Sequence, residues 1–318
     1  MPETEKRKVV IIGSGCAGHT AALYAARSGL EPLCFEGMMP GGLLTITTDV
    51  ENYPGFPEGI MGPDLMEAMK AQAERFGTEY IFDRVTEIDF SGPPHRVASP
   101  GREVMADTVI VSTGSSPRLL GLDGENRLMG HGLSTCATCD GAFFRDQEMV
   151  IVGGGDSAME EAIFLTRFAT KVTVIHRRDA LRASPIMADR ALAHEKIEFL
   201  WDTVLTGYME EEGKITGVGI HNVKNGEAGE IHAGAVFLAL GHTPNTELFE
   251  GVLELDDSGL IRTRPDSPCT SVPGVYAAGD VQDPHWRQAV TAAGSGCAAA
   301  LEAEAFLSGG HRGPVFED

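Results

Sequence analysis

The strongest constraint on the fold is a pattern that occurs twice in the chain. The apolar residues 9–12 lead into Gly-Ser-Gly-Cys-Ala-Gly at 13–18, and a helical stretch follows at 19–28. Residues 149–152 lead in the same way into Gly-Gly-Gly-Asp-Ser-Ala at 153–158 and a helical stretch at 159–168. Apolar strands follow at 32–35 and 171–175. A glycine motif between a strand and a helix predicts a dinucleotide-binding unit, so we expect two.

The two glycine turns are suited to phosphate. Glycine allows a tight turn and lets the backbone approach a pyrophosphate closely. The helix that follows presents free N–H groups and a partial positive charge at its N-terminus. Two ordinary strand–turn–helix junctions without a ligand are the alternative interpretation.

The residues after each second strand distinguish the two nucleotides. The first unit has Glu36 there, which is suited to accepting hydrogen bonds from ribose hydroxyls. The second has His176, Arg177 and Arg178, with Arg182 one turn further on. Arginines bind a 2′-phosphate well, whereas an acid would repel it. We therefore expect an unmodified ribose in the first unit and NADP in the second, the alternative for the arginines being a solvated surface turn.

Two Gly/Pro-rich segments bracket the second unit. Residues 112–117 follow an apolar strand at 108–111, and residues 240–245 follow another at 235–239. They indicate that the second domain is inserted within the first. We predict an α/β fold of two Rossmann-like three-layer domains, the first formed by residues 1–117 and 246–318 and the second by residues 118–245.

Cys136 and Cys139 are the only closely spaced pair among six cysteines. Two intervening residues allow a small disulfide ring, and a thiolate of such a pair attacks other disulfides while the second thiol resolves the product. The adjacent Asp140 is placed to relay a proton. Half of a zinc site is the alternative, but zinc would need two more ligands and no second close pair exists, so we predict no metal. A pair of inert buried cysteines is a further alternative.

The charge balance excludes some partners. The chain has 25 Lys and Arg residues against 46 Asp and Glu residues, a net charge of −21. Such an acidic surface repels phosphate backbones, so we expect no nucleic acid partner. We expect no membrane partner either, because no stretch reads as a membrane span. The apolar run after Lys8 is too short for a signal peptide, and we expect a cytoplasmic protein.

Together these motifs resemble low-molecular-weight, bacterial-type thioredoxin reductase over nearly the whole chain. The resemblance rests on both glycine turns, Gly-Gly at 41–42, Glu-Asn-Tyr-Pro-Gly at 51–55, Cys-Ala-Thr-Cys-Asp-Gly at 136–141, His-Arg-Arg at 176–178 and the stretch 279–289. It implies a thioredoxin-disulfide reductase in which electrons pass from NADPH to FAD, then to the Cys136–Cys139 disulfide, and then to thioredoxin. It also implies a homodimer.

The resemblance also implies cofactor-binding residues. FAD would contact Gly13, Ser14, Gly15, Ala17, Gly18, Glu36, Gly42, Asn52, Gly279, Asp280, Arg287, Gln288 and Ala289. NADPH would contact Gly155, Asp156, Ser157, His176, Arg177, Arg178 and Arg182. Cys136 and Cys139 would cycle between disulfide and dithiol, with Asp140 as the acid/base.

Two positions depart from the family pattern. Leu43 stands where many members have Gln, which removes a possible amide contact near the flavin. Asp156 and Ser157 stand where many have Asn and Thr. We expect Asp156 to point away from the phosphates or to accept hydrogen bonds from backbone amides.

The order of the parts predicts a moving domain. The dithiol and the nicotinamide belong to one domain and must both reach the flavin, so we expect that domain to rotate about hinges at 113–118 and 241–246. We expect Cys139 to be the cysteine nearer the flavin. A dithiol oxidase, a ferredoxin-linked reductase and a non-catalytic redox sensor are the competing functions, and the arginines favour the NADPH-dependent reductase over the first two.

Overall fold

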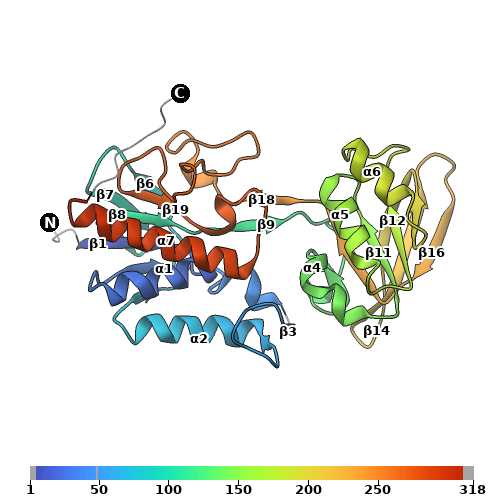
Figure 1. The fold of residues 1–318 in the computed structure, drawn as a ribbon, viewed down its shortest axis with the longest axis horizontal. Helices are drawn as coiled ribbons and strands as arrows, with labels where there is room; N and C mark the ends of the chain where they lie inside the picture. Colours follow the sequence, from blue (N-terminus) through green and yellow to red (C-terminus); the bar gives the residue numbers. More distant parts are fainter. Residues whose placement is uncertain (1–4, 48, 311–318) are drawn as a thin grey trace. The chain divides into compact units, whose positions relative to one another are not determined.

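The computed structural model describes residues 5–47 and 49–310 (Figure 1). The chain divides into two compact units. One is formed by the residues up to Ser116 together with those from Thr243 onward, and the other is Pro117–His242. The second unit is therefore inserted in the sequence of the first.

The first unit is built on a seven-stranded sheet of order β5-β2-β1-β8-β7-β6, with β19 paired to β8 outside this path. The neighbours β2, β1, β8 and β19 run parallel, whereas β6, β7 and the start of β8 form an antiparallel meander. The strands of this sheet are β1 (Glu5–Ile12), β2 (Leu33–Phe35), β5 (Glu79–Ile81), β6 (Glu87–Asp89), β7 (His95–Ser99), β8 (Arg102–Val111) and β19 (Val275–Ala277).

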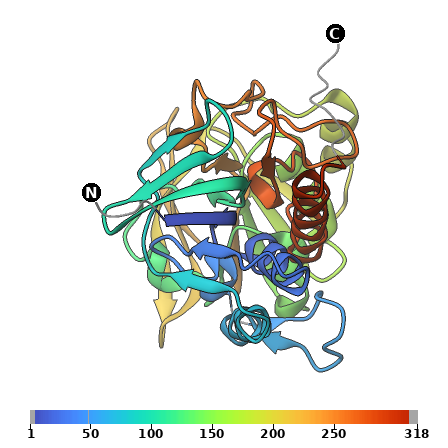
Figure 2. The same ribbon diagram turned by 90° about the vertical axis from the view of Figure 1, so that its left-hand side faces the viewer.

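The central strand β1 is buried on both faces. Val9 and Ile11 pack against the helical layer, and Val10 and Ile12 pack against the other side, as the two-residue period of a strand requires. The helices α1 (Cys16–Arg27) and α7 (Ala289–Leu307) lie side by side in that layer (Figures 1 and 2). A Cβ on Gly296 would lie 2.1 Å from the Ala17 carbonyl oxygen, so glycine is what allows the two helices to approach so closely.

The second unit has three layers. Its central five-stranded sheet has the order β10-β17-β11-β12-β13 and is parallel throughout. One face packs against helices and the other against the antiparallel sheet β14-β15-β16. Its strands are β10 (Leu133–Ser134), β11 (Glu148–Val152), β12 (Lys171–Ile175), β13 (Ile197–Leu200), β14 (Thr203–Glu211), β15 (Lys214–Asn222), β16 (Ala228–His232) and β17 (Ala235–Leu238). Its helices are α3 (Glu125–Leu128), α4 (Ala137–Asp140), η2 (Gly141–Phe144), α5 (Asp156–Leu165) and α6 (Pro185–Leu192).

Two short paired strands, β9 (Ser115–Pro117) and β18 (His242–Pro244), form the crossings between the units. The backbone N–H of Asn245 donates to the Gly114 carbonyl over 3.0 Å, and that of Arg118 donates to the Gly241 carbonyl over 2.9 Å. The remaining elements of the first unit are η1 (Gly42–Ile46), β3 (Asp49–Val50), β4 (Ile60–Met61), α2 (Gly62–Glu74), η3 (Glu247–Phe249) and η4 (Gly279–Val281).

The predicted fold class is confirmed, with one difference in detail. The helices after the glycine turns begin at Cys16 and Asp156, three residues before the expected starts at 19 and 159. The last residues of each glycine motif therefore already belong to the first helical turn. This places their N–H groups among those that have no partner inside the helix.

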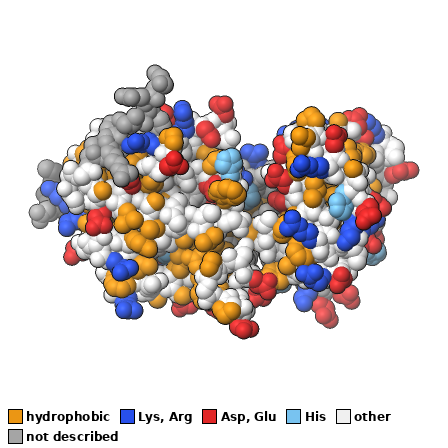
Figure 3. All heavy atoms as spheres, viewed as in Figure 1, with side chains coloured by type: hydrophobic (Ala, Val, Ile, Leu, Met, Phe, Trp, Pro, Cys, Tyr) orange, Lys and Arg blue, Asp and Glu red, His pale blue; other side chains and the backbone are white. Residues whose placement is uncertain are grey.

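Charged and apolar side chains are mixed on the face shown in Figure 3. Within residues 5–47 and 49–310, no helix combines the length and the apolar character needed to cross a bilayer.

Candidate active site and nucleotide sites

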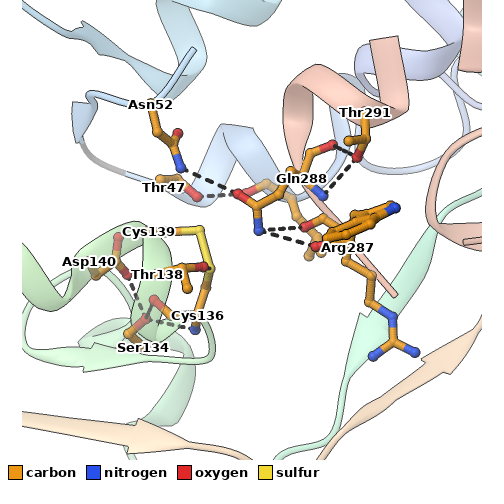
Figure 4. The surroundings of a disulfide bond; sticks show 12 residues. Thr47, Asn52, Ser134, Cys136, Thr138, Cys139, Asp140, Arg287, Gln288 and Thr291 are labelled. Carbon is orange, nitrogen blue, oxygen red and sulfur yellow. Dashed lines mark hydrogen bonds between the residues drawn. A yellow bond between two sulfur atoms is a disulfide. The ribbon is translucent and has the colours of Figure 1, made fainter. Parts of the chain in front are cut away.

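Cys136 and Cys139 form a disulfide with a Cα–Cα distance of 5.3 Å (Figure 4). Cys136 is the residue before α4, and Cys139 lies inside this short helix. The Asp140 N–H donates to the Cys136 carbonyl over 3.1 Å, which closes the turn. The pairing that the spacing predicted is therefore present, and the chain holds it by local hydrogen bonds.

Ser134 connects the disulfide to Asp140. Its hydroxyl donates to Asp140 Oδ2 over 2.6 Å and accepts from the Cys136 N–H over 3.0 Å (Figure 4). Burial raises the pKa of the Asp140 carboxyl, and the hydrogen bond from Ser134 opposes this. Asp140 thus takes up a proton more readily than an exposed aspartate, which suits an acid/base beside a dithiol. Ser134 was missed by the sequence reasoning, because a serine at a strand end carries no distinctive signal.

The described part of the chain contains no group of three His, Cys, Asp or Glu side chains arranged to hold a metal ion. The sulfur atoms of Cys136 and Cys139 are bonded to each other. The geometry at this pair is that of a disulfide.

In the first unit, the glycines of the turn at residues 13–18 differ in how much space surrounds them. Gly13 has φ +106°, and a Cβ there would lie 2.3 Å from the Ser112 carbonyl oxygen. A Cβ on Gly18 would lie 2.0 Å from the Gly13 carbonyl oxygen. A Cβ on Gly15, by contrast, would meet nothing closer than the Gly41 carbonyl oxygen at 3.9 Å. Gly13 and Gly18 shape the turn, whereas Gly15 leaves open space at the N-terminus of α1, which fits a pyrophosphate.

Glu36 lies at the end of β2, and its side chain is only 5% exposed. Lys70 Nζ on α2 donates to Glu36 Oε1 over 2.8 Å, and the same ammonium lies 5.0 Å from the centroid of the Tyr80 ring. The Ser14 hydroxyl donates to the Glu36 carbonyl over 3.2 Å. Lys70 was missed by the sequence reasoning, since it comes from a helix 34 residues away with no motif of its own.

A second group of predicted FAD residues lies where α7 begins. Gln288 is the N-cap of α7, and Asn52 Nδ2 donates to its Oε1 over 3.3 Å (Figure 4). Arg287 has φ +47°, and its Nε is buried without a hydrogen-bond partner among the described residues. Burial, together with the nearby Asp283, raises the pKa of Asp280 to about 6. An orphaned buried donor beside the half-buried carboxyl of Asp280 fits a polar ligand.

Gly42 and Gly279 lie close to the first glycine turn. A Cβ on Gly42 would lie 3.7 Å from the Gly15 Cα, and a Cβ on Gly279 would lie 3.0 Å from the Ala17 Cβ. Ala289 is the first residue of α7. Leu43 lies in η1, where its carbonyl accepts a hydrogen bond from Thr47.

The glycines of the second turn differ in the same way: two lie in tight contact with their surroundings and one has open space beside it. A Cβ on Gly153 would lie 2.6 Å from the Ala239 carbonyl oxygen, and one on Gly154 would lie 2.2 Å from the His176 ring. A Cβ on Gly155 would meet nothing within 4 Å. Gly155 is therefore the glycine that leaves room for a phosphate, at the N-terminus of α5.

His176 has a supporting position. It is buried against Gly154, and one ring nitrogen lies 3.0 Å from the Ala180 carbonyl oxygen. Burial lowers the pKa of His176, and the positive charges of the nearby arginines act in the same direction, so the ring is neutral at pH 7. The ring thus braces the loop that carries the arginines.

Hydrogen bonds tie this loop to the glycine turn. The Gly154 carbonyl accepts from the N–H groups of Arg182 and Ala183, over 2.7 and 3.1 Å. Asp156 Oδ1 accepts from the Ser184 N–H over 2.8 Å and from its hydroxyl over 2.7 Å. Asp156 therefore accepts from a backbone amide, which is one of the two arrangements expected for it. Ser184 had no recognisable signal in the sequence.

The side chains of Arg177, Arg178 and Arg182 are exposed and form no ion pair within the residues that the structure describes. All three are close enough to His176 to act on it electrostatically. Three unpaired guanidinium groups around one loop are notable in a chain of net charge −21. They fit a phosphate group. Ser157 is exposed in the first turn of α5.

Comparison with known proteins shows the family of the chain. The family model described as pyridine nucleotide-disulphide oxidoreductase matches residues 7–296. The chain belongs to this family. Like other pyridine nucleotide-disulphide oxidoreductases of this kind, it is a disulfide oxidoreductase that uses FAD and NADPH.

The similar proteins of this family include several thioredoxin reductases. One from Streptomyces clavuligerus is 55% identical, over 96% of this chain and 95% of its own length. One from Mycolicibacterium smegmatis is 53% identical, over 94% of this chain and 96% of its own. The crystal structure of the enzyme from Streptococcus pyogenes has a TM-score of 0.92 and 44% identity, covering 96% of this chain and 100% of that one. These relatives confirm the resemblance that the motifs predicted.

Proposed function

We propose that this oxidoreductase reduces the disulfide of thioredoxin with electrons from NADPH. The observation that carries this proposal is the Cys136–Cys139 disulfide, linked through Ser134 to the half-buried Asp140. This pair lies in the same unit as Arg177, Arg178 and Arg182, which form no ion pair with any residue that the structure describes. The relatives named as thioredoxin reductases at more than 50% identity support the choice of substrate.

The two units divide the cofactors between them. The first unit would hold FAD, with Gly15 suited to its pyrophosphate and Glu36 suited to its ribose, and the orphaned Arg287 Nε supports a polar ligand in the same unit. The other residues proposed for FAD are Gly13, Ser14, Ala17, Gly18, Gly42, Asn52, Gly279, Asp280, Gln288 and Ala289. The second unit holds NADPH, and the residues proposed for it are Gly155, Asp156, Ser157, His176, Arg177, Arg178 and Arg182. Asp156 and His176 act through the hydrogen bonds and packing that hold the arginine loop.

The bound cofactors supply the electron pair that reduces the disulfide. Reduction by two electrons breaks the bond between the sulfur atoms of Cys136 and Cys139 and, with one proton, leaves one thiol and one thiolate. Asp140 exchanges a proton with the pair, since its raised pKa lets it hold one. A thiolate of the pair then attacks the thioredoxin disulfide, and the remaining thiol resolves the mixed disulfide. The products are reduced thioredoxin and the Cys136–Cys139 disulfide.

The second unit rotates between two states, with hinges at 113–118 and 241–246. We infer this rotation because the second unit carries both the dithiol and the proposed nicotinamide site, while the proposed flavin site belongs to the other unit. Cys139 is the cysteine that faces the flavin. A crosslink between the units that left turnover intact would argue against rotation, and a thiolate–flavin absorption band that survived Cys139→Ser would argue against this role of Cys139.

The protein works as a homodimer in the cytoplasm, with no nucleic acid or membrane partner. A lone dithiol of this spacing is suited to a redox role in a reducing compartment, which supports the cytoplasm. The dimer is supported by the family resemblance, and sedimentation of the purified holoenzyme at micromolar concentration tests it.

One assay tests the function. The purified holoenzyme is mixed with NADPH and oxidised thioredoxin, with NADH and a thioredoxin-free sample as controls. We expect NADPH oxidation that depends on thioredoxin, and we expect Cys136→Ser to abolish it while the flavin is still reduced by NADPH. Oxygen consumption without NADPH would support a dithiol oxidase, and electrons accepted only from reduced ferredoxin would support a ferredoxin-linked reductase. Either result would overturn the proposal.

A further inference from the structure

A second carboxyl group lies behind the redox turn. Glu161 is in α5, the helix that starts at the NADPH turn and packs against α4. The backbone N–H of Ala137 donates a hydrogen bond to the Glu161 carboxyl group. Ala137 is buried and lies between Cys136 and Cys139 in sequence, so this carboxyl group contacts the backbone of the redox ring itself.

The other oxygen of this carboxyl group is unusual. Glu161 Oε2 is buried and has no hydrogen-bond partner within the described residues. Burial raises the pKa of Glu161 to about 7, the Ala137 hydrogen bond lowers it, and the neighbouring Glu160 raises it. Buried carboxyl oxygens without a partner are rare in folded proteins, so this one calls for a functional explanation.

Few other charged groups surround Glu161. Among the elements packed against α5, α4 brings Asp140 and the two cysteines. The charged residues of the other neighbouring elements are Asp189 and Arg190 on α6, Glu148 at the start of β11 and Lys171 at the start of β12. Lys171 pairs with Glu198. Of the elements packed against α5, α4 is the one that carries the redox turn.

Ala137 is the first residue of α4, and its N–H has no acceptor inside the helix. A hydrogen bond from this amide to Glu161 anchors the backbone between the two cysteines. A negative carboxylate held there also repels the thiolate that forms when the disulfide is reduced. A proton on Glu161 removes that repulsion.

We propose that Glu161 is a positioning residue of the redox pair, which anchors the Cys136–Cys139 turn through the Ala137 amide and takes up a proton when the disulfide is reduced. Two electrons and two protons convert the disulfide and the Glu161 carboxylate into one thiol, one thiolate and a neutral carboxyl group. The oxidoreductase activity supplies the electrons, and solvent supplies the protons. The inference rests on redox cycling of the disulfide but not on the identity of the protein substrate.

The test measures the dithiol–disulfide equilibrium of the holoenzyme directly. Wild type, Glu161→Gln, Glu161→Ala and the exposed control Glu160→Gln are equilibrated with mixtures of reduced and oxidised dithiothreitol at pH 6.0 and pH 8.5. Thiols at Cys136 and Cys139 are then alkylated and counted by mass spectrometry. This readout uses no thioredoxin, so a failure of the proposed substrate leaves it unaffected.

We expect Glu161→Gln to match wild type at pH 6.0, where Glu161 is mostly protonated. At pH 8.5 we expect the equilibrium constant for forming the dithiol from the disulfide to be about tenfold larger in Glu161→Gln than in wild type. The glutamine lacks the negative charge that repels the thiolate. Glu160→Gln removes only a neighbouring charge that raises the pKa of Glu161, so its equilibrium should stay within about twofold of wild type at both pH values. An equal pH dependence of wild type and Glu161→Gln would overturn the proposal.

The alanine variant tests the anchor. Glu161→Ala removes the acceptor of the Ala137 N–H, so we expect the dithiol equilibrium to change at both pH values. The glutamine oxygen can still accept that hydrogen bond, so Glu161→Gln should keep the wild-type equilibrium at pH 6.0. An alanine variant that only melts at a lower temperature, with an unchanged equilibrium, would show a purely structural role. If it does not fold, the near-isosteric glutamine variant still decides the proton-linked part.

Discussion

Lys70 Nζ lies 2.8 Å from Oε1 of Glu36, the residue that directly follows strand β2. The Glu36 side chain is 5% exposed and that of Lys70 is 33% exposed, so the carboxylate is buried and the ammonium reaches it from the surface. A buried carboxylate is costly unless a positive group compensates it. Lys70, which comes from helix α2, therefore pairs with the buried carboxylate proposed to bind the FAD ribose.

Replacing Lys70 should therefore destabilise the folded protein. We expect Lys70→Met to lower the unfolding free energy of the FAD-free protein by about 2 kcal/mol, because the buried Glu36 side chain loses its ion-pair partner. The measurement is urea denaturation monitored by circular dichroism. The control is Lys171→Met, which breaks the more exposed Lys171–Glu198 pair and should cost less than about 1 kcal/mol. Equal losses in the two variants would contradict the buried role of Glu36.

Two neighbouring glycines should respond differently to alanine. Gly155→Ala should fold normally, because its φ of −97° suits alanine and a Cβ meets nothing within 4 Å. It should nevertheless weaken NADPH binding at least tenfold, since the Cβ fills the proposed phosphate space. Gly154→Ala should destabilise the protein by about 1–3 kcal/mol, because the Cβ would overlap the buried His176 ring. Thermal melting and NADPH titration separate the effects, and tight NADPH binding by Gly155→Ala would refute the placement.

The arginine loop should select between the two nicotinamide nucleotides. We expect Arg177→Gln and Arg178→Gln each to weaken NADPH binding about tenfold, since a charged hydrogen bond to phosphate is lost. NADH binding should be unchanged, because it lacks the 2′-phosphate. The matched control is Arg190→Gln, an exposed arginine on α6. Isothermal titration with both nucleotides is the measurement, and parallel losses for NADPH and NADH would rule out phosphate recognition.

Asp280 predicts a pH dependence of stability. Its pKa is raised from 3.8 to about 6, so the folded protein keeps this proton over a pH range in which the unfolded chain has lost it. The protonated Asp280 therefore contributes to the free energy of unfolding at low pH. This contribution, at most about 3 kcal/mol, is lost as the pH rises from about 4 to about 6. We expect FAD-free Asp280→Asn to equal wild type near pH 4 and to be more stable at pH 7.5. Denaturation at both pH values is the measurement, and a constant difference between the two proteins would contradict the shift.

The prediction from sequence was strongest where all the chemistry lies within a few consecutive residues. The glycine turns were recognisable because a strand, a tight turn and a helix start must follow one another directly along the chain. Cys136 and Cys139 were recognisable for the same reason, since two intervening residues close a disulfide ring. Even so, the order of residues could not show that Gly13 and Gly154 shape the turns while Gly15 and Gly155 leave space.

The tertiary structure decided which side chains assist these motifs. Lys70 on α2 reaches Glu36 after β2, Ser184 reaches Asp156 across 28 residues, and the Ala137 amide meets Glu161 from a separate helix. Single lysines, serines and glutamates are common on any surface, so their spacing carries no signal. Sequence alone therefore determined the fold class, the two nucleotide turns and the redox pair, because these depend on local backbone geometry. Which charges are buried, paired or left without a partner depends on the packing of distant segments, and only the folded structure could decide it.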